Sequence, residues 1–404
     1  IRDFSASDSS VPLAQRGTYL AFTQAASSGV KHLKMLAQSG LKAVHLLPSF
    51  DIATIEEDRS KWETPDEKAL KKFAPDSEGQ QATLESTRDT DGFNWGYDPL
   101  HYTTPEGSYA ANPENRTLEY RQMVQSINGL GLRVVQDVVY NHTSNAGQSN
   151  NSVLDKIVPG YYHRLNLDGG LESSTCCANT ASEHTMMRKL MVDSILTWAK
   201  DYKIDGFRFD LMGHHMLEDI KTVRTALNAL TLEKDGVDGK KIYLYGEGWD
   251  FGEVAQNARG VNASQKNLFG TGVGSFSDRQ RDAVRGGGPF DEDQRTNQGY
   301  ATGLFTLPNG LSVKNTDRAA LEKAQDTVML GLAGNLKDFS FTSSSGATVK
   351  GGGIDYNGQA AGYAASPLET VTYVSAHDNE TLWDVIQMKA PRKATLEQRV
   401  RMNN

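Results

Sequence analysis

Three carboxylates in strand-like settings are the residues of this chain best suited to chemistry. Asp210 closes the run Ile-Asp-Gly-Phe-Arg-Phe-Asp, Glu247 lies in Tyr-Gly-Glu-Gly-Trp, and Asp378 lies in Val-Ser-Ala-His-Asp-Asn. Enzymes that cleave glycosidic bonds use one carboxylate that attacks carbon and one carboxylic acid that protonates the leaving oxygen. Parallel barrels assemble such a site from acids at the C-terminal ends of separate strands. The pattern therefore predicts hydrolysis of a sugar linkage.

The first acid has a cationic neighbour on the same strand face. Side chains two residues apart on a strand point the same way, so Arg208 and Asp210 are expected to lie together. A guanidinium favours the ionised carboxylate and lowers its pKa, which suits a nucleophile. The alternative is a purely structural ion pair.

The second acid is flanked by glycines. Gly246 and Gly248 let backbone or substrate approach Glu247 closely, and Trp249 follows. An apolar, aromatic setting raises a carboxyl pKa and keeps a proton available near neutral pH, as a general acid requires. A surface glutamate in a glycine turn is the alternative.

Two histidines end apolar runs close to acids. His142 follows a run rich in β-branched residues and His377 precedes Asp378, so both are suited to hydrogen bonding with sugar hydroxyls. A metal site that combines them with His214 and His215 is an alternative, but the set lacks the usual ligand spacing. No metal ligand is therefore predicted.

An aromatic and amide-rich tract covers residues 93–99, Phe-Asn-Trp-Gly-Tyr-Asp-Pro. Aromatic rings stack on sugar faces, and amide and carboxylate groups bind hydroxyls. The tract is a candidate sugar-binding loop, with a buried loop plug as the alternative.

These residues are positioned by short apolar runs that alternate with helical patterns, which is typical of a parallel α/β fold. The expected strands cover residues 41–48, 132–142, 204–210, 242–247, 273–276 and 371–376. The expected helices cover residues 30–38, 117–128, 184–200, 216–230 and 318–332. On the third of them a core stripe is expected from Met187, Leu190, Met191, Ile195 and Trp198. Long loops are expected near 51–91, 285–310 and 341–367.

Composition narrows the class of partner. The 404 residues carry a formal charge of −8 and no basic run, which argues against nucleic acid, and no apolar stretch is long enough to span a bilayer. The only cysteines, Cys176 and Cys177, are adjacent. Neighbouring Cα atoms lie about 3.8 Å apart, below the usual disulfide range, which favours two free thiols.

Taken together, the motifs resemble the four signature regions of the α-amylase superfamily, glycoside hydrolase family 13. Residues 137–142, 206–210, 246–249 and 374–378 are similar to the first to fourth regions in order, spacing and strand-end position. The resemblance spans the whole chain and implies a (β/α)8 TIM-barrel catalytic domain.

Residues 94–99 and the adjacent cysteines resemble the pullulanase and limit-dextrinase group of that family, which cleaves α-1,6 branch linkages. In this group the paired cysteines can form a vicinal disulfide, so the resemblance leaves the bond and the free thiols both open. The expected substrates are pullulan, amylopectin and limit dextrin. The alternatives are an isoamylase-like or branching enzyme, and an α-glucan-binding fragment without activity.

The resemblance assigns catalytic roles by position. Asp210 is expected to be the nucleophile, Glu247 the acid and base, and Asp378 the group that stabilises the transition state through sugar hydroxyls. Arg208 is expected to orient Asp210. The implied mechanism is double displacement with retention, which places the two carboxyl groups about 5–5.5 Å apart.

The remaining site residues are expected to bind sugar. Tyr97 is expected to stack on the ring at the cleavage point, and Trp249 to contact the sugar on the leaving side. Hydroxyl contacts are expected from the side chains of His142, His377, Asn94 and Asp98, and Trp95 is also expected to bind sugar. The resemblance implies no required cofactor and admits a structural calcium ion.

Compared with the family pattern, residues 1–404 cover a partial barrel. The start of the first strand, the eighth strand, the N-terminal carbohydrate-binding modules and the C-terminal β-sandwich are expected to lie outside this chain. Glycans at the Asn141 and Asn379 sequons would block the proposed site, which favours a source without N-glycosylation. We expect a monomeric, secreted or cell-surface bacterial enzyme.

Overall fold

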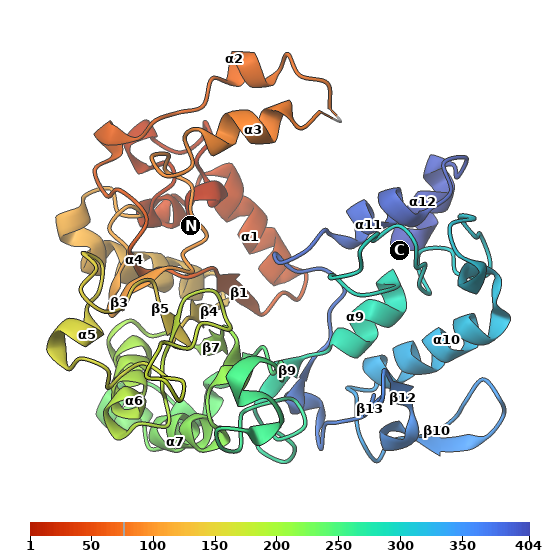
Figure 1. Ribbon diagram of the computed structural model, residues 1–404. Helices are drawn as coiled ribbons and strands as arrows, with labels where there is room; N and C mark the ends of the chain where they lie inside the picture. The colour runs from red at the N-terminus through yellow and green to blue at the C-terminus, as the bar shows by residue number, and fades with distance from the viewer. Residues whose placement is uncertain (76) are drawn as a thin grey trace. The chain divides into compact units, whose positions relative to one another are not determined.

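A computed structural model describes residues 1–75 and 77–404 of the chain (Figure 1). The backbone forms two compact units. The first comprises residues 1–244 and 249–263, and the second comprises residues 245–248 and 264–404. The chain first passes from one unit to the other inside strand β8 (Tyr243–Gly246).

Three parallel strands form the centre of the first unit: β1 (Ala43–Leu46), β4 (Arg133–Val138) and β7 (Gly206–Phe209). β4 pairs with β1 on one side and with β7 on the other, and Asp137 stands opposite Arg208. All of β7 and all of β4 after its first residue are buried, as expected for parallel strands covered on both faces. The residues that follow β4 and β7 therefore emerge at the same edge of the sheet.

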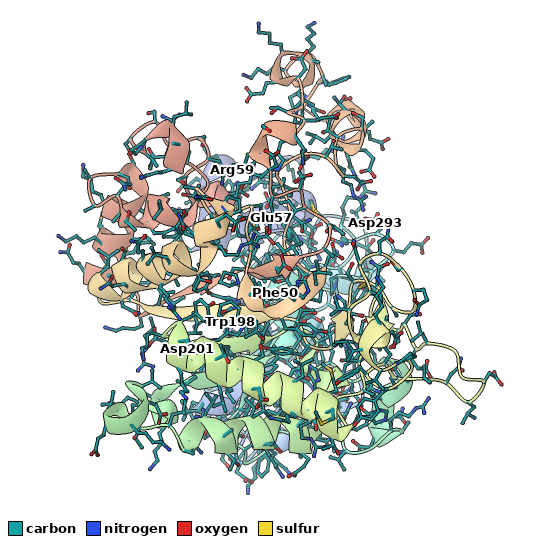
Figure 2. All side chains as sticks on the ribbon, turned by 90° about the vertical axis from the view of Figure 1, so that its left-hand side faces the viewer. Phe50, Glu57, Arg59, Trp198, Asp201 and Asp293 are labelled. Atoms are coloured by element: carbon teal, nitrogen blue, oxygen red, sulfur yellow. A yellow bond between two sulfur atoms is a disulfide. The ribbon has the colours of Figure 1, made fainter. Side chains whose placement is uncertain are left out.

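The first unit contains the four helices that the sequence predicted there: α1 (Ser28–Gln38), α4 (Arg116–Gly129), α6 (Thr185–Asp201) and α7 (Leu217–Asn228). Along α6 four of the five predicted core residues, Met187, Met191, Ile195 and Trp198, are fully buried, and Leu190 is half-buried. Figure 2 labels Trp198 on this helix, and its indole nitrogen donates to the carbonyl oxygen of Tyr102 at 2.9 Å.

Two antiparallel pairs add to this unit. β2 (Phe50–Ile52) pairs with β3 (Pro99–Pro105), and β5 (His142–Thr143) pairs with β6 (Ala178–Asn179). The second pair holds residues 174–179 beside the end of β4. Residues 51–91, predicted as a loop, include two short helices, α2 (Glu67–Leu70) and α3 (Gly79–Glu85). Two further short helices in the described part of this unit are α5 (Leu154–Ile157) and α8 (Leu232–Asp235).

The second unit has its own parallel set, in which β8 pairs with β9 (Gly274–Phe276) and β9 pairs with β14 (Thr370–Val371). Its helices are α9 (Asp278–Arg285), α10 (Arg318–Leu332), α11 (Leu382–Lys389) and α12 (Leu396–Asn403). A capping box starts α11: the Thr381 hydroxyl accepts from the backbone of Asp384, whose carboxylate accepts from the backbone of Thr381.

Two predictions for the second unit were wrong. The strand expected over residues 371–376 is only β14, because its pairing with β9 covers two residues and the backbone then leaves the extended ladder. Residues 341–367 are not a plain loop. They form two hairpins, β10 (Ser340–Thr342) with β11 (Thr348–Lys350) and β12 (Asp355–Tyr356) with β13 (Gln359–Ala360).

The second hairpin has a recognisable sequence cause. Asn357 and Gly358 both have positive φ, 49° and 81°, which a two-residue type I′ turn requires. The hairpins also have a small core of their own, where Phe341 and Ala361 pack with Leu330 of α10. In the sequence the apolar residues of 341–367 are scattered among glycine and serine, so the strands of these hairpins were not predicted.

The fold class is α/β with parallel strands, in agreement with the sequence. Each unit has three strands in parallel pairing, and a closed eight-stranded ring is not formed by residues 1–75 and 77–404. What is seen is part of a barrel. No helix within these ranges is long and apolar enough to cross a membrane.

Candidate active site

Asp210 directly follows β7 and is held by two donors. The Arg208 Nη1 donates to Asp210 Oδ1 at 2.9 Å, and the Asn141 Nδ2 donates to Oδ2 at 2.8 Å and to the backbone oxygen at 2.9 Å. Strand alternation brings Arg208 to the same face, as predicted. Both carboxylate oxygens of Asp210 are thereby fixed in one orientation.

A second carboxylate, Asp137 on β4, competes for the same guanidinium. Arg208 Nη1 also donates to Asp137 Oδ1 at 2.9 Å, the Tyr97 hydroxyl donates to Oδ2 at 2.8 Å, and His45 Nε2 lies 3.4 Å from Oδ2. Burial disfavours the charged form of Asp137. The charges and hydrogen bonds of Arg208, His45 and Tyr97 outweigh burial, so the pKa of Asp137 lies below its ordinary value.

The electrostatics of Asp210 differ from the prediction. Burial raises its pKa above the ordinary aspartate value, although Arg208 and Asn141 oppose this, and the Asp137 charge raises the pKa further. The expectation that Arg208 would lower it was wrong, because burial of Asp210 outweighs the guanidinium, which is also shared with the buried Asp137. Asp210 therefore needs a higher pH than a free aspartate to be ionised.

The aromatic tract reaches this cluster through Tyr97. The Arg208 guanidinium lies 6.0 Å from the centre of the Tyr97 ring, and the Tyr97 carbonyl oxygen lies 2.8 Å from His142 Nε2. The side chains of Asn94 and Asp98, predicted to contact sugar, both hydrogen bond with Thr54, at 3.0 and 2.7 Å. They therefore shape the loop.

Trp95 is 42% exposed, unlike the buried plug that the alternative required.

His142 is buried next to the carboxylate cluster. Its Nδ1 faces Asn141 Oδ1 at 2.7 Å, and the Asn141 amide is oriented by its bonds to Asp210. Asn141 was quoted in the sequence motif but not predicted as a site residue. Its position beside His142 after an apolar strand was the available signal.

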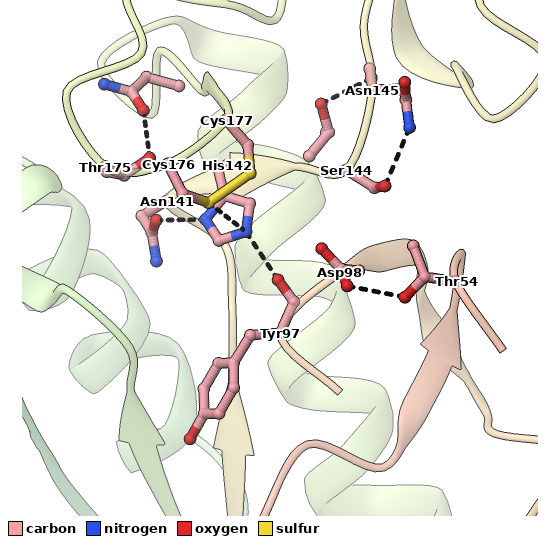
Figure 3. The surroundings of a disulfide bond; sticks show 12 residues. Thr54, Tyr97, Asp98, Asn141, His142, Ser144, Asn145, Thr175, Cys176 and Cys177 are labelled. Carbon is pink, nitrogen blue, oxygen red and sulfur yellow. Dashed lines mark hydrogen bonds between the residues drawn. A yellow bond between two sulfur atoms is a disulfide. The ribbon is translucent and has the colours of Figure 1, made fainter. Parts of the chain in front are cut away.

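Cys176 and Cys177 form a disulfide in the structure, so the prediction of free thiols from Cα spacing was wrong. Their Cα atoms are 3.8 Å apart, and the bond closes a small ring through the single peptide between them. Figure 3 shows the disulfide beside the His142 imidazole, with Cys176 Sγ 3.8 Å from Nε2. The disulfide is therefore part of the wall around His142.

Trp249 belongs to the first unit and packs against the segment that follows Asp210. A Cβ atom added to Gly213 would lie 1.9 Å from the Trp249 carbonyl oxygen and 2.9 Å from its carbonyl carbon. Glycine is therefore required at position 213 to let the Trp249 backbone approach.

Replacing Gly213 with alanine is expected to lower kcat/KM by about a hundredfold, the cost of an ångström-scale displacement near reacting groups. The added methyl would push away the backbone of Trp249, two residues beyond Glu247 in the sequence. Steady-state rates on pullulan, one of the substrates expected from the sequence resemblance, measure the effect.

The matched control is Gly129→Ala at the end of α4, where an added Cβ meets nothing within 4 Å. Equal rates for the two variants would contradict the steric argument.

Glu247, His377 and Asp378 belong to the second unit. Glu247 directly follows β8 and is buried, with 7% exposure. A Cβ on Gly248 would lie 2.8 Å from the Gln265 backbone nitrogen, so the predicted close approach at this glycine is present. In the loop after β14, His377 Nε2 lies 3.3 Å from Asp378 Oδ1, and the Asp378 side chain is half exposed.

Two groups in the described part of the chain have metal-ligand atoms close together: His142 with the two disulfide-bonded cysteines, and Asp51 with Glu57 and Glu106. In the second group the Arg116 guanidinium donates to both Glu57 oxygens at 2.5 Å. The Arg116 guanidinium therefore balances the negative charge of Glu57 in this acidic group.

No family model matches the chain. It is 48% identical over 410 residues to the chloroplast pullulanase 1 of Arabidopsis thaliana, covering 100% of this chain and 42% of that protein. It is 47% identical over 441 residues to a pullulanase of Klebsiella aerogenes, covering 100% of this chain and 39% of that protein.

Solved structures agree with the sequence relatives. The maltotriose complex of PulA from Klebsiella pneumoniae matches with a TM-score of 0.93 and 46% identity, over 99% of this chain and 46% of that one. The chain thus spans less than half the length of each of these relatives. Because sequence and fold agree along its whole extent, this chain belongs to the pullulanase family within the α-amylase superfamily.

Proposed function

We propose that the protein carrying this chain is a retaining glycoside hydrolase that cleaves α-1,6 branch linkages in pullulan, amylopectin and limit dextrins. The observation that carries the proposal is the buried Asp210 carboxylate, fixed by Arg208 and Asn141 at the carboxyl end of β7. An oriented carboxylate beside a single guanidinium is what attack on an anomeric carbon requires.

In the proposed reaction an Asp210 oxygen forms a bond to the anomeric carbon while Glu247 gives a proton to the bridging oxygen, which leaves. Glu247 then takes a proton from water, and that water displaces Asp210 from the sugar. Two inversions retain the configuration at the anomeric carbon. Side chains supply the nucleophile and the proton, so we propose no cofactor.

The sugar at the cleavage point is proposed to stack on Tyr97 and to hydrogen bond with His142, His377 and Asp378. Trp249 is proposed to contact the leaving side. Asn94 and Asp98 act indirectly in this proposal, because their contacts with Thr54 set the shape of the loop that carries Tyr97.

The relatives support this substrate class. PulA of Klebsiella pneumoniae has been crystallised with maltotriose, the repeating trisaccharide expected from pullulan cleaved at its α-1,6 bonds. The formal charge of −8 fits a neutral polysaccharide better than a nucleic acid. We propose that the protein acts on its substrate as a monomer.

Release of maltotriose from pullulan by the complete protein tests the proposal, with unbranched amylose as the control substrate. Maltotriose from pullulan without amylose cleavage is the expected result, and NMR should show the α-anomer first. New branches in amylose would instead identify a branching enzyme. Binding of pullulan without turnover would identify a non-catalytic glucan-binding protein.

Two changes at Tyr97 separate its ring from its hydroxyl. Tyr97→Ala is expected to lower kcat/KM on pullulan at least tenfold, because the loss of stacking on one ring costs about 1.4 kcal/mol or more. Tyr97→Phe keeps the ring and removes the hydroxyl with its hydrogen bond to Asp137, so most activity should remain. Equal losses in the two variants would assign the effect to the hydroxyl and contradict a stacking role.

A further inference from the structure

Glu253 is a buried carboxylate to which the proposed reaction gives no role. It lies in the 3-10 helix η8 (Gly252–Asn257), and its side chain is 7% exposed. Arg164 Nη1 and Asn179 Nδ2 each donate to Oε1 at 2.9 Å, and the Ser174 hydroxyl donates to Oε2. Burial opposes the charge, but these three donors outweigh it and lower the pKa of Glu253 to about 2.

Two of the three donors bracket the disulfide. Ser174 lies two residues before Cys176, and Asn179 lies two residues after Cys177. Asn179 also pairs with His142 through strands β6 and β5. One carboxylate therefore ties together both ends of the segment 174–179, whose sulfur lies 3.8 Å from the His142 ring nitrogen.

The third donor extends the connection to the segment that follows Asp210. The Arg164 side chain is 3% exposed, is held by Glu183 at 2.9 and 2.7 Å, and donates to the backbone oxygen of His214 at 3.0 Å. The His214 ring packs against Phe251 with centroids 4.5 Å apart. All of these residues lie in the first unit.

The 3-10 helix η8 packs tightly against the segment 174–179. A Cβ atom on Gly252 would lie 2.3 Å from the Ser174 hydroxyl oxygen, and Gly252 has a φ of +72°, which favours glycine. The backbone before Glu253 is therefore pressed against the segment that its carboxylate holds.

We propose that Glu253 is a positioning residue that fixes the segment 174–179, and with it the Cys176–Cys177 disulfide, as the wall of the sugar pocket beside His142. This inference rests on the proposed function, since it assumes that sugar binds beside His142. Glu253 contacts none of the proposed reacting groups, so its loss should weaken substrate binding more than the chemical step.

Glu253→Gln keeps the size of the side chain and removes its charge, and Glu85→Gln, at an exposed glutamate paired with Arg88, is the matched control. Losing charge-assisted hydrogen bonds should raise the KM for pullulan about tenfold or more and leave kcat within about threefold. The disulfide should also react about tenfold faster with a phosphine, measured by mass after thiol alkylation. Glu253→Asp should recover part of both effects, because it keeps the charge.

A Glu253→Gln protein with normal KM and a normal rate of disulfide reduction would overturn the proposal, as would a loss confined to kcat. If this variant does not fold, Ser174→Ala removes one donor from an exposed residue and should shift both readouts in the same direction. The phosphine measurement needs no glycosidase activity. It therefore still judges the positioning role if pullulan proves not to be the substrate.

Discussion

Asp210→Asn is expected to lower kcat on pullulan by about a thousandfold or more while largely sparing glucan binding. The amide is nearly the same size, so the contacts of Arg208 and Asn141 keep much of their geometry. It is a poor nucleophile and forms no stable glycosyl intermediate, and loss of a nucleophile removes most of the enzymatic rate. Steady-state kinetics and calorimetric binding of a glucan oligosaccharide measure the two parts separately.

The control is Asp168→Asn, at an exposed aspartate in the first unit, which should keep full activity. Near-normal turnover by Asp210→Asn would remove this residue from the nucleophile role. The acid limb of the wild-type pH profile gives a second check. Attack requires ionised Asp210, and burial raises its pKa, so kcat/KM should begin to fall with decreasing pH above the ordinary aspartate range.

The predictions about helices and strands that the structure confirmed rest on local sequence patterns. Alternation along residues 206–210 places Arg208 and Asp210 on one face, and helical spacing places Met187 and Trp198 in the core. Both depend only on neighbours in the sequence, and the side-chain periods of strands and helices fix the outcome. The elements around Asp210 could therefore be drawn from sequence alone.

Features that depend on contacts between residues distant in the sequence could not be predicted from the sequence. Asp137 lies 71 residues from Arg208 and takes a share of its guanidinium. Burial of Asp210, together with the nearby Asp137 charge, raises the Asp210 pKa against the opposing effect of Arg208. Glu253 meets Ser174 across 79 residues, and no local pattern marks either one. The short β14 has the same cause, because strand length depends on the partner strand as well as on the apolar run.

The disulfide is an instructive intermediate case. Cα spacing argued for thiols, whereas family resemblance left the bond open, and the bond is present between Cys176 and Cys177. The usual Cα–Cα range of disulfides describes bonds between separate segments, whose Cα–Cα distance can adjust. In adjacent cysteines the peptide bond fixes the Cα–Cα distance. Here the β5–β6 pairing and the Glu253 contacts hold the surrounding segment.

The second large effect is expected at Glu247. Glu247→Gln should lower kcat on pullulan by about 10²- to 10⁴-fold, the usual contribution of general acid and base catalysis. Glutamine fills the same buried space after β8 but has no proton to give to the bridging oxygen. An exposed glutamate in α8, changed in Glu233→Gln, is the control and should behave as wild type.

Leaving-group dependence distinguishes an acid from a residue that merely shapes the site. A maltotriosyl fluoride needs little or no protonation to leave, so Glu247→Gln should form the glycosyl intermediate from it at close to the wild-type rate. The later attack by water lacks its base, so the intermediate should accumulate as a burst followed by slow turnover. Equal losses on pullulan and on the fluoride, without a burst, would point to a structural role. The predicted contrast arises because the proton matters only where the leaving oxygen is a poor leaving group.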